Sequence, residues 1–186
     1  MSSDALSPFS HVILVLVGDS GAGAHDLRRM AERGGRLYWA AAPSQYYAEP
    51  KRLARLGYLE AHEQPGRTNR RTHYTLTERG RDALRAWLAT PAAFPRIQHE
   101  PAVRMLVADL ASPEAMHAML ADFGDELDEL ERLLAEGELI AEQLPRRTRW
   151  LLLNHRLSRR MIDAHRAWIA EAGELLDQSS PSSAEM

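Results

Sequence analysis

Residues 43–77, PSQYYAEPKRLARLGYLEAHEQPGRTNRRTHYTLT, determine how the rest of the chain is organised. The stretch opens with a short basic helix pattern whose leucines face inward, and Gly57 ends that helix. Two alternating runs follow, residues 58–63 and 72–77, on either side of an arginine-rich turn. A helix followed by a small β-ribbon with a basic tip is typical of a winged helix-turn-helix, so we predict that fold for this part of the chain.

Helix signals flank this stretch on both sides. Ser7 followed by Pro8 predicts a capped helix that runs to about Val17, and a second helix is expected over 26–33, before the apolar bridge 37–39. Thr77 is expected to cap a helix from Glu78 to about Ala89. Four apolar residues of that helix are expected to be buried: Ala83, Leu84, Trp87 and Leu88.

A proline-rich segment, TPAAFPRIQHEP, follows and marks a domain boundary. We therefore predict a mainly α chain: a DNA-binding domain over 1–90 with a two-stranded β wing, a linker over 91–101, a helical dimerisation and effector region over 102–178, and a disordered tail over 179–186. In the helical region, Ser112-Pro113 opens a helix of 20 or more residues. Another helix is expected from Pro145 to about Gln178.

The last predicted helix carries an apolar seam of the coiled-coil type, because its apolar residues lie mostly three or four apart. The seam consists of Trp150, Leu153, Leu157, Met161, Ala164, Trp168 and Leu175. The opposite face is expected to carry arginines at 149, 156, 159, 160 and 166.

The composition indicates a cytoplasmic protein with a sizeable core. The chain has 186 residues, of which 45% are hydrophobic, and it has no cysteine. No apolar run approaches the roughly 20 residues that a membrane helix needs, and the N-terminus lacks the basic region of a secretion signal. We expect no membrane association.

The charge is strongly segregated, although the net charge is only −3. Residues 28–85 contain thirteen Lys and Arg against six Asp and Glu, whereas residues 100–143 contain two against twelve. Residues 145–170 return to seven Arg against one acid. Because attraction to phosphate decays within a Debye length of about 8 Å, the local excess in 28–85 matters more than the sum.

Residues 8–90 resemble the PadR-type transcriptional regulators, which are winged helix-turn-helix proteins with a helical dimerisation tail. The resemblance rests on Ser44-Gln-Tyr-Tyr47, Lys51-Arg-Leu53 and Leu56-Gly57-Tyr-Leu59 for the recognition helix. Tyr74-Thr-Leu-Thr77, Gly80, Ala83-Leu84 and Trp87-Leu88 resemble the second wing strand and the helix after it, and Trp39 matches an aromatic before the recognition helix. The resemblance implies a homodimeric regulator of transcription, more often a repressor, that binds double-stranded DNA.

The predicted DNA-contacting residues lie on the recognition helix and the wing. On the helix and its start they are Ser44, Gln45, Tyr46, Tyr47, Lys51, Arg52 and Arg55. On the wing they are Arg67, Asn69, Arg70, Arg71 and His73. Pro50 departs from the family pattern, and because proline removes an N–H inside a helix, we expect the regular helix to begin near Tyr47.

The resemblance also implies a small aromatic effector near a dimer interface formed by the C-terminal helices. Trp150 and Trp168, on the apolar seam, are the candidates for lining such a pocket. Packing within the seam is the alternative role for both rings.

Other classes of function receive less support from the sequence. A helical protein–protein adaptor, with the acidic and basic C-terminal helices as its working surface, is the alternative to a DNA-binding protein. No enzyme is predicted, since Gly18-Asp-Ser-Gly21 lacks the context of a protease nucleophile and the Lys-Ser/Thr of a phosphate loop. The eight histidines show no metal-site spacing, and neither a metal nor a cofactor is expected.

Overall fold

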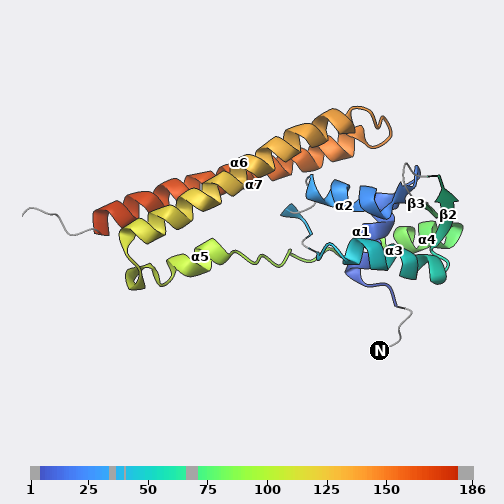
Figure 1. Ribbon diagram of the computed structural model, residues 1–186, viewed down its shortest axis with the longest axis horizontal. Coiled ribbons are helices and arrows are strands. Elements are labelled where there is room, and N and C mark those ends of the chain that lie inside the picture. Colours follow the sequence, from blue (N-terminus) through green and yellow to red (C-terminus); the bar gives the residue numbers. More distant parts are fainter. Residues whose placement is uncertain (1–4, 34–36, 40, 66–70, 180–186) are drawn as a thin grey trace, which may run out of the picture. The chain divides into compact units, whose positions relative to one another are not determined.

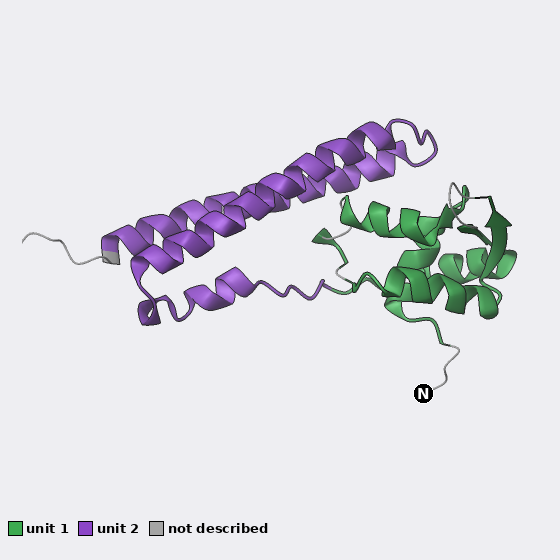
Figure 2. Cartoon of the chain, in the orientation of Figure 1, with its two compact units in different colours: residues 1–93 green, residues 94–186 purple. Residues whose placement is uncertain are grey.

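The computed structural model describes residues 5–33, 37–39, 41–65 and 71–179, and these form a mainly helical protein with one small sheet. The chain divides into two compact units, residues 1–93 and 94–186 (Figure 2). The predicted fold class, a mainly α winged helix with a helical C-terminal region, is confirmed. None of the described helices is both long enough and apolar enough to cross a membrane.

Unit 1 contains four helices and three strands among its described residues (Figure 1). In chain order they are α1 (Pro8–Val17), β1 (Ala22–Gly23), α2 (Ala24–Glu32), α3 (Gln45–Arg55), β2 (Leu59–Gln64), β3 (Arg71–Leu76) and α4 (Glu78–Leu88). The strands form an antiparallel sheet in the order β1-β3-β2.

The β-ribbon therefore gains a third strand that the sequence did not predict. β1 pairs with β3 through Ala22 opposite Tyr74, while β2 pairs with β3 from Leu59 opposite Leu76 to Gln64 opposite Arg71. Two residues carry no alternating pattern, so β1 is visible only once β3 is in place. The apolar bridge at 37–39 forms a turn and no strand.

The core of unit 1 joins α1, α2 and α3 to the inner face of the sheet. Its fully buried side chains include Ile13, Leu14, Leu27 and Leu53, and Tyr74 lies on the inner face of β3. Burying a side chain of this size stabilises a domain by about 1.5–3 kcal/mol, so these contacts dominate the packing of the unit.

Helix α4 is capped as predicted, but its apolar side chains are less buried than expected. The Thr77 hydroxyl accepts a hydrogen bond from the Gly80 N–H at 3.1 Å. Ala83 and Leu84 pack partly against the core. The prediction that Trp87 and Leu88 are buried is wrong for this chain, because they are 37% and 76% exposed. One face of the Trp87 ring is covered by His11 of α1, which stacks on it with centroids 5.0 Å apart.

Unit 2 is a long helical hairpin with one short helix before it. Its elements are α5 (Glu100–Met105), the 3-10 turn η2 (Ala108–Leu110), α6 (Pro113–Ala141) and α7 (Thr148–Ser179). Helices α6 and α7 run antiparallel along each other (Figure 1). Ser112 caps α6 as predicted, since its hydroxyl accepts the Ala115 N–H at 3.3 Å.

The face of α7 that packs on α6 is not the apolar seam read from the sequence. The buried residues of α7 are Ser158, Ile162, Ala172 and Leu176, and three of these four directly follow a seam residue. The seam itself is largely exposed: Trp150 at 56%, Leu153 at 47%, Leu157 at 48% and Leu175 at 62%. Helix α7 therefore has two neighbouring apolar stripes, and only one is covered within the chain.

Ion pairs join the acidic α6 to the basic α7. The guanidinium of Arg159 lies 2.8 Å from Glu138 and 3.3 Å from Glu131, and Arg166 lies 2.6 Å from Asp128 and 2.7 Å from Glu131. These two arginines, expected on a face opposite the seam, thus face α6. Each exposed pair stabilises the hairpin by at most about 1 kcal/mol.

Candidate nucleic-acid interface

Helix α3 begins earlier than predicted and accommodates Pro50. Its first turn is tight, with the N–H groups of Gln45, Tyr46 and Tyr47 donating to carbonyls three residues back at 2.9, 3.3 and 3.1 Å. The expected start near Tyr47 is therefore wrong, and the helix runs from Gln45 to Arg55 with proline inside it. The Pro50 ring is fully buried, so its packing in the core offsets the lost backbone hydrogen bond.

The end of α3 is fixed by a Schellman motif. Gly57 adopts φ +76°, a left-handed conformation that glycine reaches without strain. Its N–H donates to the Ala54 carbonyl at 3.0 Å, and the Tyr58 N–H donates to the Leu53 carbonyl at 3.0 Å. Strand β2 begins at Leu59, so α3 connects to the wing without a flexible segment.

One face of α3 is exposed and carries positive charge. Helical spacing places Ser44, Ala48, Lys51 and Arg55 on this face, opposite the buried residues of the helix. Lys51 and Arg55 make no ion pair with any residue in the described part of the chain. Gln45 and Tyr47 flank the same face, and Tyr47 is 40% exposed. Ala48 was missed by the sequence reasoning because alanine carries no polar group.

Tyr46 does not belong to this face, which corrects the sequence prediction. Its side chain is only 4% exposed, and its ring meets the Phe9 ring edge-on with centroids 5.3 Å apart. Burial raises the pKa of Tyr46, and the negative charge of Glu32 raises it further. Tyr46 is a core residue that attaches α3 to α1, so it is not available to reach bases.

Arg52 is also corrected, because its guanidinium is held inside unit 1. It donates from Nε to Glu49 at 3.0 Å and from Nη2 to Glu49 at 2.9 Å and to the Ser10 hydroxyl at 3.0 Å. Ser10 is fully buried and itself donates to Glu49 at 2.7 Å. This three-residue network, Ser10–Glu49–Arg52, connects α1 to α3.

The charge state of Glu49 follows from this network. Burial alone would raise the pKa of its carboxyl group. The hydrogen bonds from Arg52 and Ser10 and the positive charge of Arg52 outweigh that effect, so the pKa of Glu49 is lowered. Glu49 is therefore ionised, and it neutralises Arg52 inside the domain.

The described part of the wing places Arg71 and His73 differently. Arg71 is exposed at the start of β3, opposite Gln64. His73 is half-buried on the outer face, opposite His62, and a Cβ atom added to Gly21 would lie 2.3 Å from its Nε2. The His73 ring therefore rests against the turn before β1. Arg67, Asn69 and Arg70 lie outside the described residues.

The two tryptophans proposed for an effector pocket do not lie together. They are 18 residues apart on α7, which corresponds to roughly 27 Å along a helix. Trp150 is covered on one face by the Arg149 guanidinium, 4.4 Å from its ring centroid. Trp168 instead lines an open hollow of about 260 Å³. The other lining residues are His99, Ala102, Ala164 and His165.

A second hollow, of about 430 Å³, lies beside the start of α3 and was not predicted. Its lining residues are Arg28, Ala31, Glu32, Trp39, Ala41, Pro43 and Tyr46. Arg28 pairs with Glu32 at 2.9 Å, while its Nε is buried without a hydrogen-bond partner. Over residues 5–33, 37–39, 41–65 and 71–179, no three His, Cys, Asp or Glu side chains are grouped so as to hold a metal ion.

Comparisons with known proteins place this geometry in a structural group. No protein-family model matches the chain, and no curated protein matches it by sequence. Bacillus subtilis PadR in complex with operator DNA is similar in structure, with a TM-score of 0.70 at 17% identity, over 94% of this chain and 98% of that chain. A PadR-like transcriptional regulator from Bacillus cereus gives 0.74 at 14% identity, over 92% and 99%.

The virulence activator AphA of Vibrio cholerae is a further structural neighbour. It gives a TM-score of 0.61 at 24% identity, over 91% of this chain and 96% of that chain. These similarities extend over both units and not only over the winged helix, so the helical C-terminal region is part of the shared architecture. The chain has the fold of the PadR-type transcriptional regulators.

Proposed function

We propose that this protein is a sequence-specific DNA-binding regulator of the PadR family, acting as a homodimeric repressor. The observation that carries the proposal is the exposed face of α3, which presents Lys51 and Arg55 without ion-pair partners in the described part of the chain. Strand β3 of the wing brings Arg71 from the same unit. B. subtilis PadR, which shares this fold, has been seen in complex with operator DNA.

The contact set on α3 is corrected by the exposure of its side chains, and the wing residues are kept as the sequence predicts them. On α3 we assign DNA contact to Ser44, Gln45, Tyr47, Lys51 and Arg55. On the wing we assign it to Arg67, Asn69, Arg70, Arg71 and His73. Lys51 and Arg55 would meet phosphates or guanine edges, and Gln45 and Tyr47 would reach the groove from the helix start. Tyr46 and Arg52 act through the core and not through contact.

The exposed seam of α7 supports a homodimer. Trp150, Leu153, Leu157 and Leu175 form an apolar stripe along a helix whose other stripe is already covered by α6. A second copy of the chain has the same stripe and the same length, so it can cover the seam by symmetry. Two recognition helices would then reach half-sites about one turn, roughly 34 Å, apart.

A small aromatic effector is the proposed signal that releases DNA. B. subtilis PadR has also been seen in complex with p-coumaric acid, at 17% identity to this chain. In this chain the hollow beside Trp168 supplies an aromatic wall and two imidazoles. The dimer would have one conformation whose two recognition helices fit successive grooves and another whose recognition helices do not. An effector that binds the second conformation more tightly than the first would release the operator.

The test is the salt dependence of binding to the DNA upstream of the protein's own gene. Fluorescence anisotropy with Arg55→Ala should show about tenfold weaker binding and a log–log salt slope smaller by about 0.9 for one lost phosphate contact. Arg96→Ala, in the exposed linker, is the matched control and should leave both quantities unchanged. Failure of the folded dimer to bind any DNA at low salt would overturn the proposal and favour the adaptor.

A further inference from the structure

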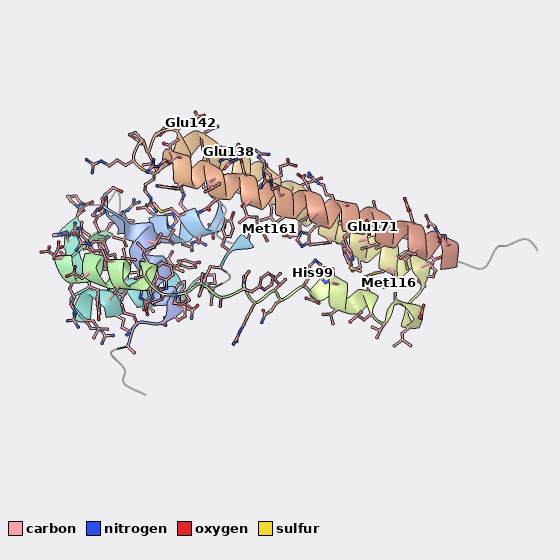
Figure 3. All side chains as sticks on the ribbon, turned by 180° about the vertical axis from the view of Figure 1, so that it is seen from behind. His99, Met116, Glu138, Glu142, Met161 and Glu171 are labelled. Carbon is pink, nitrogen blue, oxygen red and sulfur yellow. The ribbon has the colours of Figure 1, made fainter. Side chains whose placement is uncertain are left out.

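His99 lies where the linker meets unit 2 and caps the helix that follows. Figure 3 shows it at the start of α5, on the side of the α6–α7 hairpin. Its Nδ1 accepts the Ala102 N–H at 3.0 Å, which is the role that a Ser or Asp oxygen fills at most helix N-termini. An acceptor nitrogen carries no proton, so the ring is neutral with its proton on Nε2.

The His99 ring is packed among three other rings of unit 2. It stacks on His165 with centroids 4.9 Å apart and an interplanar angle of 11°. It also meets Trp168 edge-on at 5.3 Å and Phe123 edge-on at 5.5 Å. These contacts fix the start of α5 against both helices of the hairpin.

The surroundings of His99 favour its neutral form. From α7 the titratable group packed against it is His165, whose Nδ1 lies 2.5 Å from the Met161 carbonyl and must donate to it. From α6 the contacting group is the uncharged Phe123 ring. On α5 itself, the Glu100 carboxylate is held by Arg104 at 2.5 Å. Burial lowers the pKa of His99, and His165 lowers it further.

We propose that His99 is a proton-operated latch, which holds α5 on the hairpin at neutral pH and releases it in mild acid. A proton on Nδ1 converts the capping acceptor into a donor that faces the Ala102 N–H. The same proton places a charge on a ring that is packed among aromatic side chains and stacked on His165. Burial and the neighbouring His165 disfavour the protonated ring in the docked state, and together they outweigh the backbone hydrogen bond that favours it.

The sign and the size of the pH response follow from linkage. Because docking lowers the pKa of His99, the docked state is most stable above the ordinary histidine pKa of about 6.5 and becomes less stable as the pH falls below that value. For one proton, the docking equilibrium changes by up to tenfold per pH unit until the pH reaches the docked pKa.

Release would lengthen the connection between the two units. In the docked form the chain without helix or strand extends over residues 89–99, and in the released form it extends over residues 89–111, up to the Ser112 cap of α6. Doubling a flexible tether lowers the effective concentration of the tethered unit by about threefold. This last step rests on the proposed function, because it predicts weaker binding of a dimer to its operator in acid.

Limited proteolysis of the full chain tests the latch without DNA. Trypsin can cut after Arg104 in α5, and Arg96 in the linker provides a reference that corrects for the activity of trypsin at each pH. The ratio of cleavage at Arg104 to cleavage at Arg96 should be low at pH 7.5 and rise by up to tenfold per unit below about pH 6.5. Cleavage after Arg160 in α7 should not change.

Two variants complete the test. His99→Asn keeps a capping oxygen but takes up no proton, so its ratio should stay low at every pH. His99→Ala has no cap and should give a high ratio at every pH. A flat ratio in the unmodified chain, a pH response that persists in His99→Asn, or a parallel rise at Arg160 would overturn the latch. If cleavage at Arg104 shows the predicted pH response but operator affinity is the same at pH 5.5 and 7.5, the claim that a longer connection weakens DNA binding is refuted. The proposed DNA binding itself is not affected by that result.

Discussion

The arginines at 52 and 55 are nearly one turn apart on α3, yet their substitution should have opposite consequences. In Arg52→Ala, the hydrogen bonds to Glu49, Ser10 and the Ala5 carbonyl are lost, and Glu49 and the fully buried Ser10 are left poorly satisfied. Breaking such a network costs about 2–3 kcal/mol of the free energy of unfolding, because the remaining carboxylate keeps its desolvation penalty. In Arg55→Ala, an exposed side chain without an ion pair in the described part of the chain is removed, and the cost should stay within about 0.5 kcal/mol.

Thermal and urea unfolding of both full-length variants separates the two roles. A loss of 2 kcal/mol corresponds to a decrease of roughly 10 °C in the Tm of a unit of this size. We expect that decrease in Tm for Arg52→Ala. Its salt slope for operator binding should be nearly unchanged when it is measured at a temperature at which unit 1 is folded. We expect an unchanged Tm and a reduced salt slope for Arg55→Ala.

The opposite pattern would refute this account of α3. This would be the case if Arg52→Ala had the Tm of the unmodified chain and a salt slope reduced by one phosphate contact. Arg52 would then leave Glu49 and bind DNA. Glu49→Gln is the matched control, since it keeps the shape of the network and removes the negative charge. It should lower the Tm less than Arg52→Ala does.

Three further predictions concern stability. Because the pKa of Glu49 is lowered, its ionised carboxylate stabilises unit 1 above the ordinary glutamate pKa of about 4.3, and this stabilisation is lost as the pH falls below that value. The urea midpoint should therefore decrease between pH 6 and pH 3, and it should decrease less in Glu49→Gln. Gly21→Ala should destabilise unit 1 by about 2 kcal/mol or more in thermal unfolding, since φ is +72° and the new Cβ would lie 2.3 Å from His73. In the same assay, Gly124→Ala should stabilise α6 by about 0.5–1 kcal/mol, because the new Cβ would have no other atom within 4 Å. Thr77→Ala should cost about 1–2 kcal/mol through the lost α4 cap, and a Tm unchanged within 2 °C would contradict that role.

The sequence predicted the elements whose signals are local. Ser7, Thr77 and Ser112 each cap the helix that follows them, and the three caps are confirmed. Gly57 ends α3 because no other residue so readily adopts its φ. These features depend on contacts within a few residues, so a single amino-acid sequence is enough to predict them.

The features that the sequence could not give depend on distant contacts. Tyr46 and Tyr47 are neighbours in sequence, and only the position of Phe9 on α1 shows which ring is buried. Arg52 has the composition of a phosphate ligand, but Ser10, 42 residues away, makes it a structural residue. On α7, two adjacent apolar stripes have the same period, so only the placement of α6 shows which stripe it covers.

The Schellman joint at Gly57 has a consequence for how such a protein could change its target. Since α3 passes directly into β2, a regulator that contacts DNA through these two elements, as proposed above, would hold them at a fixed spacing. New specificity would then arise by exchanging side chains on a constant frame, at exposed positions such as 45, 48, 51 and 55, none of which contributes to the core. In the proposed role, substitutions at these positions would alter the operator sequence at little cost in stability, whereas a different spacing between the contacts would require a different connection between α3 and β2.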